Sequence, residues 1–184
     1  MNLDEITAWR PFTDSNGNTV DLSFLDAHKV TYVHRKDGCP DVNYEFWVTY
    51  SFHCFAKDYD HLSDEDRQRL KYDAGKDARP FCYTRYELAK THLRPTVEAL
   101  GTQEVLVMHA GYESYAAAKI VDANGEDKWY YVPFVVYRQQ KKFRIHVTSA
   151  YPVEERPGGG KVGFFVIAHN LKSGKPLPRP AKKR

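Results

Sequence analysis

The alternation of apolar and polar positions predicts strands over much of the chain. Residues 28–34 and 44–55 are rich in β-branched and aromatic side chains and are separated by a loop-like stretch, so we expect an antiparallel strand pair within residues 28–55. Turn residues separate a later series of strand-like segments, which predicts a β-meander over residues 104–169. Its expected strands are residues 104–109, 112–121, 129–138, 142–151 and 161–169.

Two helices are expected between these groups of strands. Residues 64–73 are dense in charges of both signs, which predicts a short exposed helix. In residues 85–100 the apolar side chains recur at spacings of three, four and seven, which predicts a helix with one buried face. Thr84 and Glu87 have the form of a capping box at its start. Pro95 predicts a kink or a break within it.

The order of these elements indicates an α+β fold with a mainly antiparallel, curved sheet and one or two helices packed on one face. The chain has 184 residues, which suits a single domain, and we place that domain at residues 1–171. The pair Asn16 and Gly17 predicts a loose N-terminal hairpin. Pro133 cannot donate a ladder hydrogen bond, so its strand should have an edge or a bulge there.

Charge separates the end of the chain from the rest. The net charge is +3, but the last 13 residues hold six Lys and Arg side chains and no acid. The remainder is therefore slightly acidic. Residues 172–184 are also rich in proline, and we expect them to form a disordered basic tail. Such a tail can contact nucleic acid or keep the protein in solution.

Composition also gives an expected location and redox state. No run approaches 18 apolar residues and the first residues do not resemble a signal peptide, so we expect a soluble, cytoplasmic protein with no membrane partner. Cys39, Cys54 and Cys82 are sparse and odd in number, which favours reduced thiols. A zinc site built from these cysteines and His53 is a weaker alternative, because the spacing lacks a usual ligand pair. We expect no metal and no cofactor.

The segment 142–151 carries the densest group of chemically useful side chains. Alternation places its cationic and imidazole side chains on one face and its apolar side chains on the other. Cleaving an RNA phosphodiester without a metal requires a base, an acid and cations near the phosphate, and histidine can serve as acid or base near neutral pH. Arg144 and His146 suit these roles. Candidate substrate contacts are Lys141, Lys142 and Arg85.

A family resemblance supports this interpretation. Residues 144–152, RIHVTSAYP, resemble the C-terminal strand motif of the barnase/EndoU/colicin E5/RelE superfamily of compact ribonucleases, in which a small hydroxyl residue precedes Ala-Tyr-Pro. Many of these proteins are toxins or phage-borne domains. The resemblance covers about residues 84–170 and implies helices before a curved four-stranded sheet, with RNA cleavage that needs no metal. It also implies that Ser149 and Tyr151 orient the substrate.

The sequence departs from that family in two respects. It has an additional strand pair before residue 56 and lacks a clear pair of histidines. Alternation also places Tyr151 on the opposite face from His146, unless the strand bulges. His109 is a further candidate, because the glycine two residues later lets the backbone turn closely, as in many site loops.

The leading hypothesis is a metal-independent endoribonuclease-like domain of a toxin or phage-encoded factor, with RNA and a protein inhibitor or partner as its expected partners. Its candidate catalytic residues are His109, Arg144, His146, Ser149 and Tyr151. The alternative is a non-catalytic module that binds nucleic acid or protein through the same aromatic and basic surface. Acid and base groups that converge in one cleft would favour the enzyme, whereas their absence would favour binding.

Overall fold

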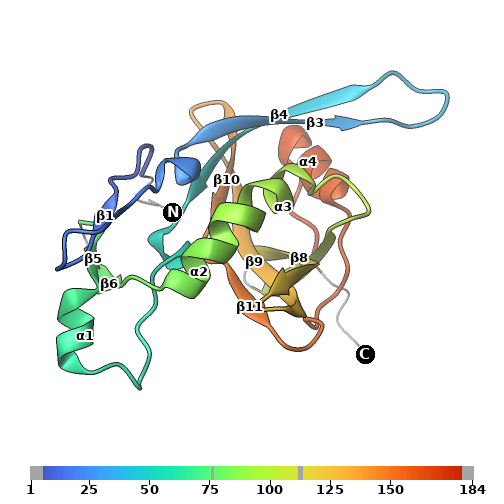
Figure 1. Cartoon of the computed structure of the whole chain (residues 1–184). Helices are drawn as coiled ribbons and strands as arrows, with labels where there is room; N and C mark the ends of the chain where they lie inside the picture. The colour runs from blue at the N-terminus through green and yellow to red at the C-terminus, as the bar shows by residue number, and fades with distance from the viewer. Residues whose placement is uncertain (1–5, 76, 112–113, 180–184) are drawn as a thin grey trace.

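The computed structural model describes residues 6–75, 77–111 and 114–179, and it has the predicted α+β class with a curled, mainly antiparallel sheet (Figure 1). The largest unit is a seven-stranded sheet in which β11 (Tyr151–Val153) pairs with β9 beyond the end of β10. In spatial order, the other strands are β3 (His28–His34), β4 (Val42–Tyr50), β10 (Lys142–Val147), β9 (Glu126–Gln139), β8 (Ser114–Ala123) and β7 (Leu106–Gly111).

Strands β7, β8, β9 and β10 are antiparallel neighbours in chain order, as expected of a meander. Two of its connections are tight turns that require positive φ at both central residues. Asn124 and Gly125 have φ of 59° and 80°, and Gln140 and Lys141 have φ of 49° and 64°. The turns expected between the strands 112–121, 129–138 and 142–151 are therefore confirmed.

The N-terminal strand pair joins the meander in the same sheet, which the sequence did not predict. Strands β3 and β4 pair antiparallel, as expected. On its other side β4 pairs with β10 in parallel, from Phe46 opposite Phe143 to Tyr50 opposite Val147. The Ser51 amide extends this joint by donating to the Val147 carbonyl at 2.8 Å. The two parallel strands consequently end at the same edge of the sheet.

The expected strand 142–151 is interrupted between β10 and β11, and the interruption lies beside Pro133. The amide and hydroxyl of Thr148 both donate to the Pro133 carbonyl, at 2.9 and 3.3 Å. Strand β9 pairs with β10 as far as Phe134 and with β11 from Tyr131 onward. The irregularity that Pro133 predicted is therefore confirmed.

The last expected strand, residues 161–169, is wrong, because helix α4 (Phe164–Ser173) occupies most of it. Its apolar positions recur at helical rather than alternating spacing, and the helix ends at Gly174 in the left-handed conformation, with φ of 66°. The side chains buried along it are Phe164, Ile167 and Ala168.

The expected helix 64–73 is shorter than predicted. Helix α1 (Asp64–Arg69) begins with the Ser63 hydroxyl accepting a hydrogen bond from the Asp66 amide at 3.1 Å. Beyond it the chain forms a small hairpin of β5 (Lys71–Asp73) and β6 (Ala78–Pro80). The predicted N-terminal hairpin is present as β1 (Phe12–Thr13) and β2 (Thr19–Val20).

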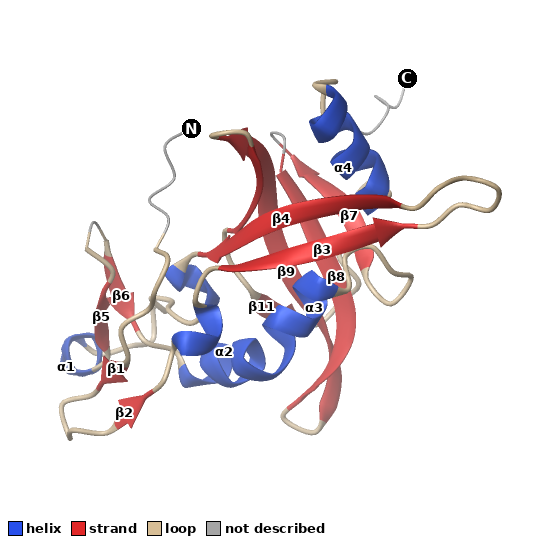
Figure 2. Ribbon diagram, turned by 90° about the horizontal axis from the view of Figure 1, so that it is seen from above, coloured by secondary structure: helices blue, strands red, loops and turns tan. Residues whose placement is uncertain are grey.

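The long helical segment packs across one face of the sheet, as predicted (Figures 1 and 2). It comprises α2 (Tyr83–Leu88), a π-helical turn η3 (Ala89–Leu93) and α3 (Arg94–Glu98). The π-turn ends two residues before Pro95 and widens the helix close to where proline lacks its N–H. The predicted break is therefore a π-turn. The predicted capping box is wrong, because the helix begins after Cys82 and no side chain caps it.

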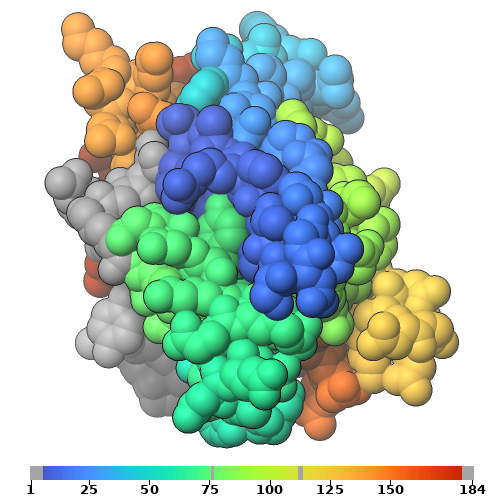
Figure 3. Space-filling model, turned by 60° about the vertical axis from the view of Figure 1, so that its left-hand side comes forward, coloured from blue at the N-terminus to red at the C-terminus, as the bar shows by residue number. Residues whose placement is uncertain are grey.

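An aromatic cluster joins the N-terminal segment to the middle of the chain. Phe12 stacks on Phe81 with ring centres 4.2 Å apart, and Trp9 lies edge-on to Phe55 at 5.2 Å. Figure 3 shows this N-terminal segment, in blue, lying against the green segment that contains β5, β6 and α2. These contacts extend the core beyond the sheet. Short 3₁₀ turns, η1 (Ser23–Leu25) and η2 (Phe52–Cys54), complete the described elements.

The predicted disordered tail is wrong for residues 172–179, while residues 180–184 lie outside the described residues. Lys172 and Ser173 belong to α4. Beyond them, the Tyr115 hydroxyl donates to the Pro178 carbonyl at 2.9 Å and Leu177 packs against the core. In the described part of the chain, no helix is long and apolar enough to cross a membrane.

Deleting residues 175–184 should lower the melting temperature. The deletion removes the Tyr115 hydrogen bond, worth about 1 kcal/mol, and the partial burial of Leu177, worth about 1 kcal/mol. Together these losses correspond to about 4 to 8 °C for a chain of this size. Calorimetry measures the shift, and Tyr115→Phe gives the share of the hydrogen bond. An unchanged melting temperature would show that this segment does not dock.

Candidate functional site

The structure separates the candidate residues into distinct places. Arg85, Ser149 and Tyr151 come together where β4 and β10 end, whereas Arg144 and His146 lie along β10. His109 lies on β7, and Lys141 and Lys142 lie at the turn between β9 and β10.

The first group, with His53, forms what we call the Arg85 cluster. Arg85 donates from Nη1 to the His53 carbonyl at 2.8 Å and to the Ser149 hydroxyl at 3.4 Å. The Ser149 hydroxyl also donates to the His53 carbonyl at 3.3 Å, and the guanidinium lies 5.1 Å from the centre of the Tyr151 ring. His53 follows β4 and Ser149 follows β10, so the parallel pairing of these strands creates the cluster.

Further side chains extend the Arg85 cluster. The Tyr151 ring lies edge-on to Tyr131 at 5.5 Å, and the Tyr59 hydroxyl lies 3.8 Å from the Cys82 sulfur. Burial raises the pKa of Tyr59, while a hydrogen bond to Arg85 opposes that shift. Burial lowers the pKa of His53, and the Arg79 and Arg85 cations lower it further, which keeps the imidazole neutral at pH 7. The sequence offered no signal that Tyr59 belongs here.

His146 does not join this cluster. It is 6 % exposed, and its Nδ1 shares a hydrogen bond of 2.9 Å with the Thr49 hydroxyl, its neighbour in the parallel ladder. Burial lowers the pKa of His146 to about 4, so the ring is neutral at pH 7. Arg144 lies two residues before His146 on β10, and its guanidinium is 5.9 Å from the centre of the Trp47 ring. Because this imidazole is buried and hydrogen-bonded, it is better suited to a structural role than to the role of an acid or base that must reach a substrate.

The other candidates also stand apart. His109 accepts a hydrogen bond at Nδ1 from the Gly111 amide at 3.1 Å and holds the irregular end of β7, where Gly111 has φ of 96°. Lys141 and Lys142 are exposed at the β9–β10 turn, in the orange segment at the upper left of Figure 3. Among the described residues, Arg85 donates hydrogen bonds to His53 and Ser149, and the His109 ring accepts one from Gly111, so His109 and the lysines are not part of the Arg85 cluster.

The three cysteines are unpaired and differ in exposure. Cys39 is exposed in the turn between β3 and β4, Cys82 is half-buried, and Cys54 is fully buried, which raises its pKa to about 12. Within residues 6–75, 77–111 and 114–179, no three His, Cys, Asp or Glu side chains are grouped so that they could hold a metal ion. The zinc alternative therefore has no geometric support in that part of the chain.

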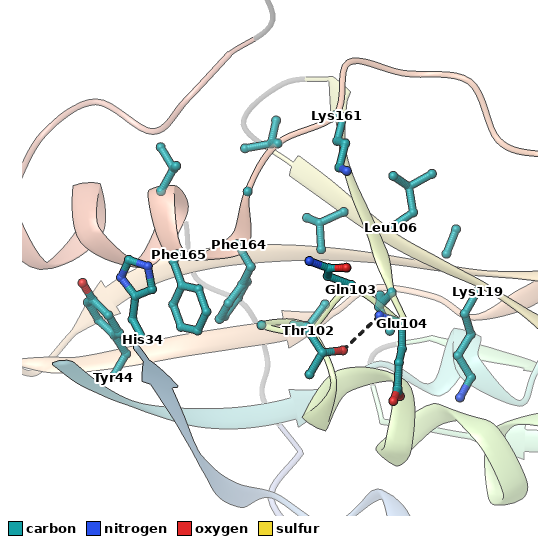
Figure 4. A pocket seen from close by; sticks show the side chains of 18 of the residues that line it. His34, Tyr44, Thr102, Gln103, Glu104, Leu106, Lys119, Lys161, Phe164 and Phe165 are labelled. Atoms are coloured by element: carbon teal, nitrogen blue, oxygen red, sulfur yellow. Dashed lines mark hydrogen bonds between the residues drawn. The ribbon is translucent and has the colours of Figure 1, made fainter. Parts of the chain in front are cut away.

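A larger hollow, which the sequence did not predict, lies between α4, β8 and the loop after α3. We call it the α4 cleft, and its volume is about 1080 Å³. Figure 4 shows aromatic side chains on one side, Lys119, Lys161 and Leu106 on the other, and Gln103 between them. Its aromatic side is formed by His34 and Tyr44, from the β3–β4 hairpin, and by Phe164 and Phe165, from α4.

Close packing shapes this cleft. A Cβ atom at Gly101 would lie 2.8 Å from Cζ of Phe165, so glycine lets the end of the helical segment approach α4. The His34 ring stacks on Phe165 with centres 4.3 Å apart, and the Arg156 guanidinium lies 5.9 Å from the centre of the Trp129 ring. The cleft was missed because its aromatic wall depends on a helix where the sequence suggested a strand.

The buried state of His146 should make folding pH-dependent. Its pKa falls from 6.5 in the unfolded chain to about 4 in the folded one, so between these values the unfolded chain binds more protons. As the pH is lowered through this window, the free energy of unfolding should therefore decrease, by about 3 kcal/mol in total. Urea unfolding at pH 7 and near pH 4 should show this loss, and His146→Gln should lack it. An NMR titration placing the pKa of His146 near 6.5 would contradict this.

Comparisons with known proteins give the family of the chain. The model of the YjaZ family matches residues 11–172. The chain is 52 % identical over 179 residues to Protein YjaZ of Escherichia coli strain K12, covering 97 % of this chain and 98 % of that protein. No solved structure matches the chain. From the extent of both matches, the chain belongs to the YjaZ family.

Proposed function

We propose that the chain is a binding module that holds an acidic, amphipathic peptide segment of a protein partner in the α4 cleft. The observation that carries this proposal is the pairing of exposed aliphatic side chains with cations around one hollow. Ile120 and Val166, which line the cleft, are 55 % and 51 % exposed. Exposed apolar surface next to a concave site is typical of a surface that a partner covers.

The apolar part of the cleft suits several side chains of a peptide. Leu106, Trp129 and Phe165 lie beside the two exposed aliphatic residues. Covering such surface is favourable by about 25 cal/mol per Å² of apolar area. The cleft volume of about 1080 Å³ lies at the upper end of ligand pockets and exceeds what a small metabolite needs.

The charged side chains of the cleft select an acidic occupant. Among the described residues, Lys119, Arg156 and Lys161 line it together with one carboxylate, that of Glu104. Electrostatic complementarity of this kind steers encounter and disfavours basic partners. A nucleic acid is a weaker fit, because base stacking needs open aromatic faces. In this cleft Arg156 lies over Trp129, and His34 covers a face of Phe165.

Peptide titration tests this proposal, monitored by the fluorescence of Trp129 in a Trp9→Phe, Trp47→Phe background that removes the other two tryptophans. A helical peptide with leucines on one face and glutamates on the other should change the emission and saturate. Ile120→Asp and Lys161→Glu should each weaken binding about tenfold, the expected effect of losing one apolar anchor or one well-placed charge. Lys142→Glu, at the distant β9–β10 turn, is the matched control and should bind normally.

Three results would contradict the peptide proposal: no saturable change with the acidic peptide, equal binding when its glutamates are replaced by lysines, or unchanged binding by both cleft variants. Single-stranded RNA provides the competing class of ligand. If RNA displaced the peptide from the cleft, the nucleic-acid module would replace the peptide module.

Metal-independent RNA cleavage remains a second candidate, favoured by the convergence of Arg85, Ser149 and Tyr151. A guanidinium can stabilise charge on a phosphate, and the neutral imidazole of His53 has the protonation state of a base. This candidate assigns no catalytic role to His146, whose replacement should alter stability rather than rate.

Incubating RNA with the protein in EDTA tests this second candidate. Cleavage should leave a 2′,3′-cyclic phosphate, and His53→Ala should lower the rate about a hundredfold or more if His53 is the base. Tyr151→Phe should slow cleavage only if its hydroxyl reaches the substrate. RNA that stays intact across sequences would exclude this activity while leaving the peptide proposal untouched.

A further inference from the structure

We infer that the Arg85 cluster binds a phosphate group. This inference does not depend on a peptide in the α4 cleft, and it does not require RNA cleavage. It concerns the ligand chemistry of the surface where β4 and β10 end.

The first argument is the unbalanced charge of Arg85. Its side chain is half-buried, and its partners are a carbonyl, a hydroxyl and an aromatic ring, all of them neutral. Among the described residues, no carboxylate lies within ion-pair distance of it, whereas Arg67 and Arg94 each have such a partner. Its Nε is buried and has no hydrogen-bond partner. A partly desolvated guanidinium in this setting gains most from an anion.

The surroundings of Arg85 are also positively charged. Lys57, Arg79 and Arg85 all act to lower the pKa of His53, and Asp77 is the acid that opposes them. Arg79 and Asp77 form an ion pair at 3.3 Å, so Lys57 and Arg85 leave the balance of these charges positive. An anion would be attracted to it before making any hydrogen bond.

The hydroxyl groups around Arg85 favour phosphate over carboxylate. Arg85 comes from α2, Ser149 from the link between β10 and β11, and Tyr59 from the loop after η2, so their donors lie on three different segments. The Ser149 hydroxyl donates to the His53 carbonyl, but its hydrogen can rotate to a ligand. A phosphate offers several oxygens in a tetrahedral arrangement, whereas a carboxylate offers two in one plane.

The phosphate can be free or part of a nucleotide. Tyr131 and Tyr151 line a hollow of about 260 Å³ beside the cluster, with Glu155 and Arg156, of opposite charge, also on its wall. Their rings lie in contact with one another, and the guanidinium of Arg85 lies over Tyr151. A nucleoside attached to the phosphate would add apolar contacts in this hollow that inorganic phosphate lacks.

Titration of the full-length protein with inorganic phosphate, at constant ionic strength, tests the inference. The Arg85 Nε–H resonance should shift and saturate, and phosphate should raise the melting temperature. Arg85→Gln should abolish both the saturable response and the rise in melting temperature. Arg85→Lys should weaken binding about tenfold, because lysine keeps the charge but lacks the planar guanidinium that donates two parallel hydrogen bonds. Arg138→Gln, an exposed arginine over Phe143, is the matched control and should behave as the wild type.

Two further ligands define the chemistry. Uridine monophosphate that binds more tightly than phosphate would support the site and identify a nucleotide source, while equal affinity would support the site and indicate free phosphate. Acetate that binds as well as phosphate would overturn the phosphate assignment. Inorganic phosphate needs only the Arg85 cluster, none of whose residues lines the α4 cleft, so failure of the Arg85 response to phosphate is distinguishable from failure of the peptide proposal.

The inference is overturned if phosphate causes no saturable shift at Arg85, or if folded Arg85→Gln protein retains the wild-type response. Should that variant not fold, the wild-type resonance and Ser149→Ala decide the question. Ser149→Ala should weaken phosphate binding while the protein stays folded, and unchanged affinity together with an unmoved Arg85 resonance would contradict the site.

Discussion

The parallel pairing of β4 with β10 is the constraint on which the rest of the structure depends. It joins a hairpin from the first third of the chain to a meander from the second half in one sheet. Both candidate sites follow from it. At one end of β4, Tyr44 contributes to the wall of the α4 cleft. Beyond its other end, the His53 carbonyl accepts hydrogen bonds from Ser149 and Arg85.

The two sites depart in different ways from what folding alone favours. The α4 cleft leaves Ile120 and Val166 exposed to water, although burial of such side chains stabilises folded proteins. The Arg85 cluster holds a half-buried cation without a neighbouring carboxylate among the described residues. Departures of this kind concentrate at functional sites, because a bound partner or ligand supplies the missing interaction. Our proposals therefore assign an apolar, acidic peptide to the first site and a phosphate to the second.

Much of the fold could be predicted from the sequence because its signals are local. The tight turns at Asn124 and Gln140, the buried helical segment before Gly101 and the disturbance at Pro133 each depend on a few neighbouring residues. Helix α4 was missed because its opening, Phe164 to Val166, is a short aromatic and β-branched run that also suits a strand. The parallel joint could not be predicted, since nothing local in β4 specifies a partner about 100 residues away.

The candidate site was predicted in part for the same reason. Ser149 and Tyr151 were found through a short motif, and the interruption after Val147 brings both to Arg85. His146 and Arg144 were grouped with them by sequence proximity, but His146 faces Thr49 and is buried there. Long-range burial decides the protonation state of a histidine, and a single sequence does not reveal it.

Hydrogen exchange across the joint between β4 and β10 is the most direct test of this account. If the joint organises the molecule, the ladder amides of β4 and β10, and that of Ser51, should exchange slowly and in one cooperative unit with β9. Exchange in which the β3–β4 hairpin opens independently, much faster than β8 and β9, would contradict it. The two sites would then have no common support.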